Sequence, residues 1–133
     1  MSTLNYLIKR HEGLRLLPYR DTEGVLTIGY GHNLEKGITQ ETAEFILQCD
    51  IQDAMQDAKK LFPELETYGI GRQAVLVSMA FNLGLKRLSG FKKMIGAVLS
   101  KQWDTAADEM LQSKWAGQVG KRANELADMM REG

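Results

Sequence analysis

Residues 38–62 contain neither glycine nor proline, and they lie between Gly37 and Pro63. Apolar side chains recur along this stretch at helical spacing, with Asp50 as a polar exception: Ala43, Leu47, Ile51, Ala54, Ala58 and Leu61. Thr39 is placed to cap the N-terminus of a helix, and Pro63 to end it. The sequence therefore predicts one long amphipathic helix, to which smaller elements on either side must attach.

The residues before this helix predict a short helix and a β-hairpin. Residues 3–11 show helical spacing. Residues 14–20 contain Pro18, which restricts a strand to a sheet edge because proline cannot donate a ladder hydrogen bond. Residues 21–24 are typical of a turn, and residues 25–30 are rich in β-forming side chains. Because a lone hairpin is marginally stable, we expect it to pack on another element.

The residues after Pro63 predict a helical bundle. Residues 72–83 are apolar on nearly all sides and are expected to form a central buried helix. Three further helices are expected, with breaks at Gly84, Gly90 and residues 117–120: about 91–99, 104–112 and 121–130. These elements predict an α+β fold that is predominantly α, with a ligand cleft between two lobes.

Composition excludes several classes of protein. The 133 residues suit one domain, and the 44% hydrophobic and 26% charged residues are typical of a globular chain. No apolar run approaches the roughly 20 residues of a membrane-spanning helix, and no basic-then-apolar signal peptide is expected at the N-terminus. One cysteine, Cys49, cannot form an internal disulfide, and with two histidines it makes a poor metal set. We therefore expect no metal and no cofactor.

Charge is balanced overall but divided along the chain. The 17 Lys and Arg residues match 17 Asp and Glu residues, so nucleic acid is not an expected partner. Residues 41–68 carry seven acids and two lysines, whereas residues 84–122 carry eight basic residues and three acids. Solvated helix faces are the usual reason for such a division, and an acidic polymer bound to the basic region is the alternative.

Two carboxyl groups near the N-terminus could act together. Glu12 is expected at the end of the first helix, beside Gly13, where the helix dipole disfavours a carboxylate anion. A general acid must keep its proton until it reacts, and a position that disfavours the anion suits that role. A surface glutamate without such a role is the commoner case. Asp21 follows nine residues later. Glycoside hydrolysis uses two carboxyls that flank one bond, but aspartate is also a favoured first residue of a turn.

Two further side chains have a structural and a functional interpretation. Thr27 lies six residues after Asp21, where it would orient a water molecule or simply fill a strand. His32 follows a glycine-separated run, and a lone histidine is more often structural, for example in an ion pair with an acid.

The segments around these residues carry a specific pattern: HEGLRL at 11–16, YRDTEG at 19–24 and LTIGYGH at 26–32. Further matches cover nearly the whole chain: GITQETAE at 37–44, SMAFNLG at 78–84, QWDTAA at 102–107, SKW at 113–115 and KRA at 121–123. Together they resemble the phage-type lysozymes, glycoside hydrolase family 24. The segment between Gly31 and Thr39 is short for this family, which predicts a reduced small lobe.

The resemblance implies a single lysozyme-like domain over residues 1–133. Its lobes would be a small β lobe at about 13–38 and a helical lobe of 1–12 with 63–133, joined by a helix at 39–62. Glu12 would be the proton donor, and Asp21 with Thr27 would place the water. Arg122 would pair with Glu12, and His32 with Asp50.

The resemblance also implies substrate-binding and supporting positions. The sugar-contacting positions fall on Asn33, Phe81, Met94 and Glu109, of which only Phe81 keeps the residue type of the family. Asn82 belongs to the motif that reaches the cleft, and Trp115 to a tryptophan motif.

The expected function is a muramidase that hydrolyses the β-1,4 bond between N-acetylmuramic acid and N-acetylglucosamine. Its partner would be the peptidoglycan glycan strand, with neither nucleic acid nor membrane insertion. By resemblance to endolysins, the protein would be a monomer that accumulates in the host cytoplasm and leaves through a holin pore.

Two alternatives remain at this stage. A lytic transglycosylase would need the acid but no hydrolytic water, so the presence of both Asp21 and Thr27 argues against it. A degenerate cell-wall-binding or structural module would not need Glu12, Asp21 and Thr27 together.

Overall fold

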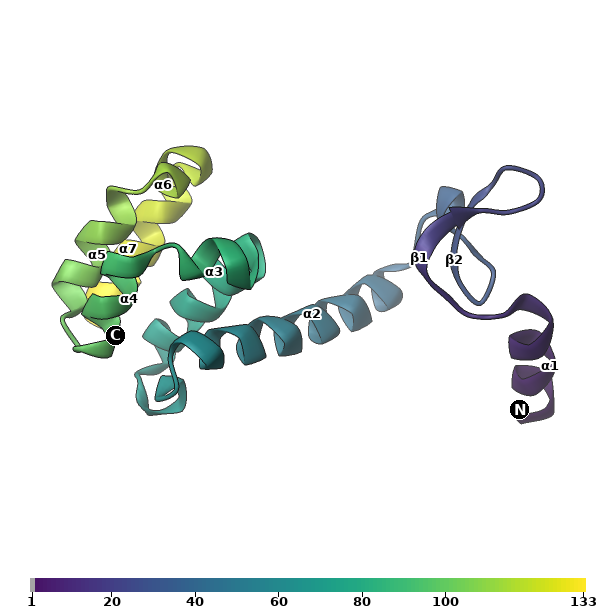
Figure 1. The fold of residues 1–133 in the computed structure, drawn as a ribbon, viewed down its shortest axis with the longest axis horizontal. Coiled ribbons are helices and arrows are strands. Elements are labelled where there is room, and N and C mark those ends of the chain that lie inside the picture. Colours follow the sequence, from purple (N-terminus) through teal and green to yellow (C-terminus); the bar gives the residue numbers. More distant parts are fainter. Residues whose placement is uncertain (1) are drawn as a thin grey trace. The chain divides into compact units, whose positions relative to one another are not determined.

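The computed structural model describes residues 2–133, and its fold is α+β and mostly α, as predicted (Figure 1). The elements follow in this order: α1 (Ser2–Glu12), β1 (Arg15–Arg20), β2 (Leu26–Gly29), β3 (His32–Asn33), η1 (Leu34–Lys36), α2 (Gln40–Leu61), η2 (Leu65–Thr67), α3 (Ile70–Ser89), α4 (Lys92–Leu99), α5 (Trp103–Leu111), α6 (Lys114–Val119) and α7 (Lys121–Glu132). The chain divides into a sheet unit up to Phe45 and a helical unit from Ile46 to Gly133. The predicted assignment of residues 1–12 to the helical lobe stays a prediction.

The sheet unit contains an antiparallel sheet with the strand order β1-β2-β3. β1 lies at the edge and contains Pro18, as predicted. Tyr19 pairs with Thr27, and the register is irregular between Arg15 and Tyr19, around the proline. An edge position allows this because the missing N–H of Pro18 interrupts no central ladder.

The prediction of a two-stranded hairpin is wrong, because the sheet has three strands. β3 adds a third strand, which pairs Ile28 with His32 and Thr27 with Asn33. Between β2 and β3 the chain reverses at two glycines with positive φ, Gly29 at 69° and Gly31 at 73°. This backbone conformation suits glycine because it has no Cβ. The propensity of residues 25–30 did not reveal that a second turn follows so soon.

The long helix forms as predicted. The backbone N–H of Thr42 donates to Oγ1 of Thr39 at 3.2 Å, which confirms the predicted N-cap. α2 ends at Leu61, close to Pro63. Two members of its apolar stripe, Ala54 and Ala58, are buried in the helical core.

The central helix is longer than predicted. α3 runs from Ile70 to Ser89 rather than over 72–83, and its regular backbone is interrupted at Gly84, where φ is 78° and ψ is 164°. The predicted end at Leu83 therefore marks a kink, after which helix resumes. Its buried side chains form the middle of the core: Val75, Leu76, Met79, Ala80, Leu83 and Leu88.

Four helices follow α3, rather than the predicted three. The additional helix, α6, begins after Ser113, whose Oγ accepts a hydrogen bond from the N–H of Ala116 at 3.2 Å. Gly117 lies inside α6, so only Gly120, with φ 61°, separates α6 from α7. A six-residue helix has too few turns to give a clear apolar period, which is why the sequence pattern missed it.

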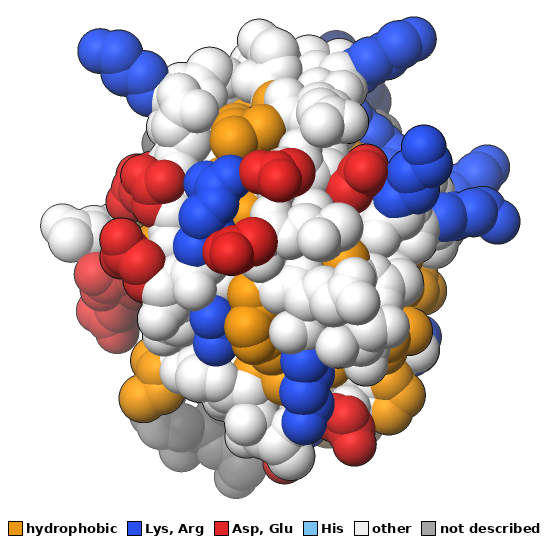
Figure 2. Space-filling model, turned by 90° about the vertical axis from the view of Figure 1, so that its left-hand side faces the viewer, with side chains coloured by type: hydrophobic (Ala, Val, Ile, Leu, Met, Phe, Trp, Pro, Cys, Tyr) orange, Lys and Arg blue, Asp and Glu red, His pale blue; other side chains and the backbone are white. Residues whose placement is uncertain are grey.

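Small side chains shape the contact between α5 and α7, which lie side by side (Figure 1). The alanines of these helices are almost completely buried: Ala106, Ala107, Ala123 and Ala127. Because alanine has a single methyl group, the two backbones can approach closely. On the surface, Nη2 of Arg131 lies 2.6 Å from Oδ1 of Asp108, and Figure 2 shows acidic and basic side chains interspersed over one face of the molecule.

Arg72 fastens the start of α3 to the end of α7. Its Nε donates to the carbonyl of Met130 and its Nη2 to that of Arg131, both at 2.7 Å. Its guanidinium carbon lies 4.3 Å from the ring centroid of Trp103. The last carbonyls of a helix have no intrahelical partner, so Arg72 satisfies two of them from a neighbouring helix.

We expect Arg72→Met to lower the free energy of unfolding by about 2–3 kcal/mol, because it removes two charge-assisted hydrogen bonds while keeping most of the aliphatic volume. Urea unfolding followed by Trp fluorescence measures this. Arg87→Met is the matched control, because that arginine of the same helix bonds only to exposed Gln118 at 3.5 Å among the described residues. Equal losses in the two variants would contradict the role of Arg72.

Candidate functional site

Glu12 occupies the last position of α1, as predicted. The helix stops because Gly13 adopts a φ of 71°, and its N–H donates to the carbonyl of Lys9 at 2.9 Å. Glu12 is exposed, and the negative end of the helix dipole lies at its backbone.

The end of α1 contacts the turn between β2 and β3. The Nζ of Lys9 lies 5.4 Å from the ring centroid of Tyr30. A Cβ added at Gly31 would lie 2.7 Å from Oε2 of Glu12, so the carboxyl group rests directly on the glycine backbone. These two contacts place the carboxyl of Glu12 beside the sheet.

Asp21 opens the β1–β2 turn with its side chain. Its Oδ1 accepts hydrogen bonds from the N–H groups of Glu23 and Val25, both at 2.9 Å. Its own N–H donates to the carbonyl of Val25 at 2.9 Å. The turn role that the sequence allowed is therefore present, and it uses one carboxylate oxygen. Within residues 2–133, Oδ2 makes no hydrogen bond.

Thr27 is the buried polar residue of the described chain, with 3% of its surface exposed. Its hydroxyl donates to the carbonyl of Val25 at 2.8 Å. The hydroxyl hydrogen is thus used in the bond to Val25, and the hydroxyl oxygen can still accept a hydrogen bond. Because Asp21 also bonds to both backbone groups of Val25, this one residue joins Asp21 to Thr27.

Val25 is a site residue that sequence reasoning missed. Its contribution comes entirely from its backbone, so its side chain gave no signal. The spacing of four residues from an aspartate to a strand start is the only hint, and many ordinary turns share it.

His32 and Asn33 brace the segment after the sheet. Nε2 of His32 lies 3.1 Å from the carbonyl oxygen of Gly37. Oδ1 of Asn33 accepts from the N–H of Glu35 at 2.8 Å, and Oε2 of Glu35 accepts from the N–H of Leu26 at 3.2 Å. The pairing of His32 with Asp50 and the sugar contact of Asn33 stay predictions.

In the helical unit, the predicted residues Asn82 and Trp115 form a pair. Nε1 of Trp115 donates to Oδ1 of Asn82 at 2.9 Å, and its ring meets that of Phe91 edge-on, with centroids 6.3 Å apart. Trp115 is buried, so the hydrogen bond satisfies the one polar group of its indole.

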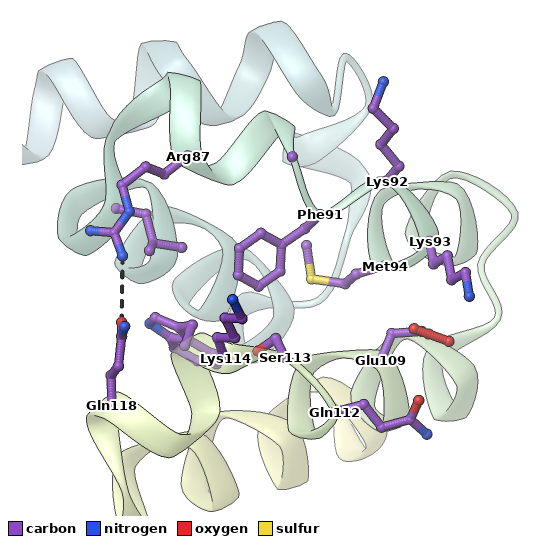
Figure 3. Close-up of a pocket in the computed structure, with 13 residues that line it drawn as sticks. Arg87, Phe91, Lys92, Lys93, Met94, Glu109, Gln112, Ser113, Lys114 and Gln118 are labelled. Carbon is purple, nitrogen blue, oxygen red and sulfur yellow. Dashed lines mark hydrogen bonds between the residues drawn. The ribbon is translucent and has the colours of Figure 1, made fainter.

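Met94 and Glu109 line one pocket of about 720 Å³, together with Trp115 and Phe91 (Figure 3). Met94 is buried and Glu109 is half-buried. The rim is strongly basic: Arg87, Lys92, Lys93 and Lys114. None of these four forms an ion pair within residues 2–133, so the rim is open to an anionic ligand.

Phe81 and Asp50 lie at a second hollow of about 240 Å³ between α2 and the kink of α3. Asp53, Asp57 and Gly84 also line it. Phe81 is 47% exposed. Arg122 lies in the first turn of α7 and is exposed. Its pairing with Glu12 stays a prediction.

The described part of the chain contains no group of three or more His, Cys, Asp or Glu side chains placed to hold a metal ion. No helix among residues 2–133 is both long and apolar enough to cross a membrane.

Comparison with known proteins decides the family. Residues 9–131 match the family described as phage lysozyme. The chain belongs to the phage lysozyme family. The match includes Glu12, Asp21 and Thr27, and it includes the helices that form the basic pocket.

Relatives within this family come from different sources. The chain is 28% identical to the probable T4-type lysozyme 2 of Dictyostelium discoideum, over all of this chain and 96% of that protein. It is 31% identical to the endolysin of Salmonella phage P22, over 83% of this chain and 80% of that protein. It is 30% identical to the pre-baseplate central spike protein of Enterobacteria phage T4, over 96% of this chain but only 27% of that protein.

The first of these alignments spans 163 positions against the 133 residues of this chain. The relative therefore carries residues that this chain lacks. Between Gly31 and Thr39 the structure has only β3 and η1, and the shortening of this segment relative to the family stays a prediction.

We expect Asp21→Ala to speed hydrogen exchange of the Glu23 and Val25 amides about fivefold to tenfold, since each loses a hydrogen bond worth about 1 kcal/mol. Asp21→Asn keeps Oδ1 and should leave both amides close to the wild-type rate. Nuclear magnetic resonance measures both rates. Equal protection in the Asp21→Ala variant would show that the turn does not depend on this side chain.

Proposed function

We propose that this member of the phage lysozyme family is a muramidase, which hydrolyses the β-1,4 bond between N-acetylmuramic acid and N-acetylglucosamine. The observation that carries the proposal is the shared attachment of Asp21 and Thr27 to Val25. A carboxylate and a hydroxyl fixed to one backbone residue suit the task of holding one water molecule.

The hydrogen bonds of the site define how that water would lie. Oδ1 of Asp21 is used by the turn, which leaves Oδ2 to accept a hydrogen from the water. The hydroxyl of Thr27 donates a hydrogen bond to the carbonyl of Val25, so its oxygen can accept a hydrogen bond from the second hydrogen of the water. A water that donates both hydrogens keeps a lone pair on its oxygen, which is the nucleophile that hydrolysis needs.

In the proposed reaction Glu12 gives its proton to the glycosidic oxygen while the bond to the anomeric carbon breaks. The water attacks that carbon from the opposite face, and its proton passes to Asp21. Exchange with solvent restores both carboxyl groups. Attack from the opposite face inverts the anomeric configuration, and the products are two shorter glycans with one water added.

We also propose that the basic pocket takes part of the substrate, because it gathers two of the predicted substrate-binding residues, Met94 and Glu109. Peptidoglycan stem peptides carry carboxylates, and four cations surround this pocket with one acid among them. Phe81 would contact sugar from its exposed position, with Asn82 orienting Trp115 beside the pocket. Arg122 and the His32–Asp50 pair would support the site.

The cellular setting is part of the proposal. The relatives named endolysins support a chain that acts on the cell wall. We propose in addition that it is a monomer that accumulates in the host cytoplasm and is released through a holin pore. No cofactor enters the proposed reaction.

A structural module is the second candidate, and one comparison favours it. The T4 relative is named as a pre-baseplate central spike protein, and its match to this chain covers only 27% of its length. A chain of this kind would bind the cell wall within a larger phage assembly without needing catalysis. Folded wild-type protein that binds cell walls but does not cleave their glycan would favour this function.

We expect wild-type protein to clear chloroform-permeabilised Gram-negative cells, and Glu12→Gln to reduce the rate by at least about a hundredfold, because the amide cannot give a proton. The wild type and Glu12→Gln should show the same circular dichroism. An active Glu12→Gln variant would remove Glu12 from the acid role.

The products separate hydrolysis from the transglycosylase reaction. In oxygen-18 water, hydrolysis puts the label on the new muramic end, whereas a transglycosylase releases unlabelled anhydro ends. Retained anomeric configuration in the first product, seen by nuclear magnetic resonance, would contradict the role given to Asp21.

We expect the double change Lys92→Ala with Lys93→Ala to raise KM about fivefold to tenfold on peptide-bearing glycan, since it removes two exposed charges from the pocket rim. On glycan stripped of its peptides KM should not change. Lys86→Ala with Lys121→Ala is the control, because neither lysine lines the pocket. An equal rise on both substrates would show that the pocket does not recognise the peptide.

A further inference from the structure

The turn between β2 and β3 contains two glycines that look equivalent in sequence. Gly29 ends β2 and Gly31 precedes β3, and both have positive φ, 69° and 73°. A residue with a Cβ is strained at either position for the same backbone reason. Strain alone therefore predicts that the two positions tolerate alanine equally poorly.

The space around the two glycines is different. A Cβ added at Gly29 would meet no atom within 4 Å. A Cβ added at Gly31 would lie 2.7 Å from Oε2, 2.9 Å from Cδ and 3.3 Å from Cγ of Glu12. Carbon and oxygen atoms that are not bonded do not approach this closely without displacement. The carboxyl end of Glu12 thus lies in the space that a side chain at position 31 would occupy.

We propose that Gly31 is a positioning residue for Glu12: the bare backbone of Gly31 fixes where the proton donor lies. The inference rests on the proposed function, in which Glu12 is the general acid. Gly31 itself gives no group to the reaction. It acts by leaving a space in which the nearest three atoms all belong to the side chain of Glu12.

One contact joins the end of α1 to this turn independently of the carboxyl. Lys9 lies over the ring of Tyr30, the residue between the two glycines, at 5.4 Å. Within the helix end itself, the N–H of Gly13 donates to the carbonyl of Lys9 at 2.9 Å, which fixes where α1 stops. With the helix end held, the flexible, exposed side chain of Glu12 is the part that must move when Gly31 gains a methyl group.

The expected consequence is a folded protein with a misplaced acid. A displacement of about 1 Å at a reacting group can cost about a hundredfold in rate. We therefore expect Gly31→Ala to lower kcat about tenfold to a hundredfold with KM within about twofold, because glycan binding does not depend on the acid. Gly29→Ala carries the same backbone strain and should keep kcat within about threefold of wild type.

The comparison of these two variants tests the proposal. Purified peptidoglycan digestion gives kcat and KM, and thermal unfolding gives the loss of stability, which should be similar for both. Equal loss of kcat in Gly29→Ala and Gly31→Ala would overturn the positioning role. A Gly31→Ala variant with wild-type kcat would do the same.

A second background isolates the contact between the two residues. Glu12→Asp shortens the side chain by one methylene and withdraws the carboxyl from Gly31. In that background Gly31→Ala should lower kcat no more than Gly29→Ala does. The same loss of kcat with Glu12 and with Glu12→Asp would show that Gly31 acts through something other than this contact.

Two readouts keep the proposal independent of catalysis and of folding yield. The carbon-13 resonance of the Glu12 carboxyl should shift in Gly31→Ala and not in Gly29→Ala, even if the wild type proves inactive on glycan. An unshifted resonance would overturn the proposal. If Gly31→Ala fails to fold while the equally strained Gly29→Ala folds, adding Glu12→Ala should restore folding, and continued failure to fold would overturn the proposal.

The two hypotheses fail in different ways. Inactive wild type, or an active Glu12→Gln variant, refutes the proposed function and leaves the carboxyl resonance to decide the role of Gly31. Active wild type with an inactive Glu12→Gln variant supports the function, and the glycine pair then decides the role of Gly31 by itself.

Discussion

Gly29 and Gly31 adopt positive φ angles of 69° and 73°, and the sheet unit depends on the reversal of the chain that they allow. The reversal pairs β3 with β2, so that Thr27 becomes the middle residue of a three-strand ladder between Tyr19 and Asn33. It also presents a bare backbone to the end of α1, where the carboxyl of Glu12 rests. A side chain at Gly31 would strain the turn and displace the carboxyl together. The turn between β2 and β3 therefore determines both the path of the third strand and the place of the Glu12 carboxyl.

The two acidic residues are placed by different physical means. Glu12 is placed by a helix end and a steric contact, and it is exposed. Asp21 is placed by two hydrogen bonds to one of its oxygens, which leave the other free among the described residues. The first arrangement suits a group that gives a proton to a bulky substrate. The second suits a group that must hold a small molecule such as water in one orientation.

The helical unit is held by packing and by a few polar contacts that each satisfy an otherwise unpaired group. Arg72 caps the C-terminus of α7 by donating to two of its last carbonyls. Asn82 accepts the hydrogen bond of the indole N–H of Trp115. The second contact fixes one wall of the basic pocket, where Met94 and Glu109 lie. The neutral net charge of the chain thus conceals a local concentration of cations, because four of the eight basic residues of segment 84–122 surround one pocket: Arg87, Lys92, Lys93 and Lys114.

The sequence by itself determined the α+β class, the long helix with its Thr39 cap, the edge position of the strand with Pro18 and the motif of Glu12, Asp21 and Thr27. Each depends on near neighbours in the chain or on a short motif, so residue order is enough. Only the tertiary structure decided the third strand, the continuation of α3 beyond Gly84, helix α6, the bond of Asp21 and Thr27 to Val25, and the contact of Glu12 with Gly31. These features depend on backbone groups or on residues distant in the chain, and side-chain patterns carry no record of either.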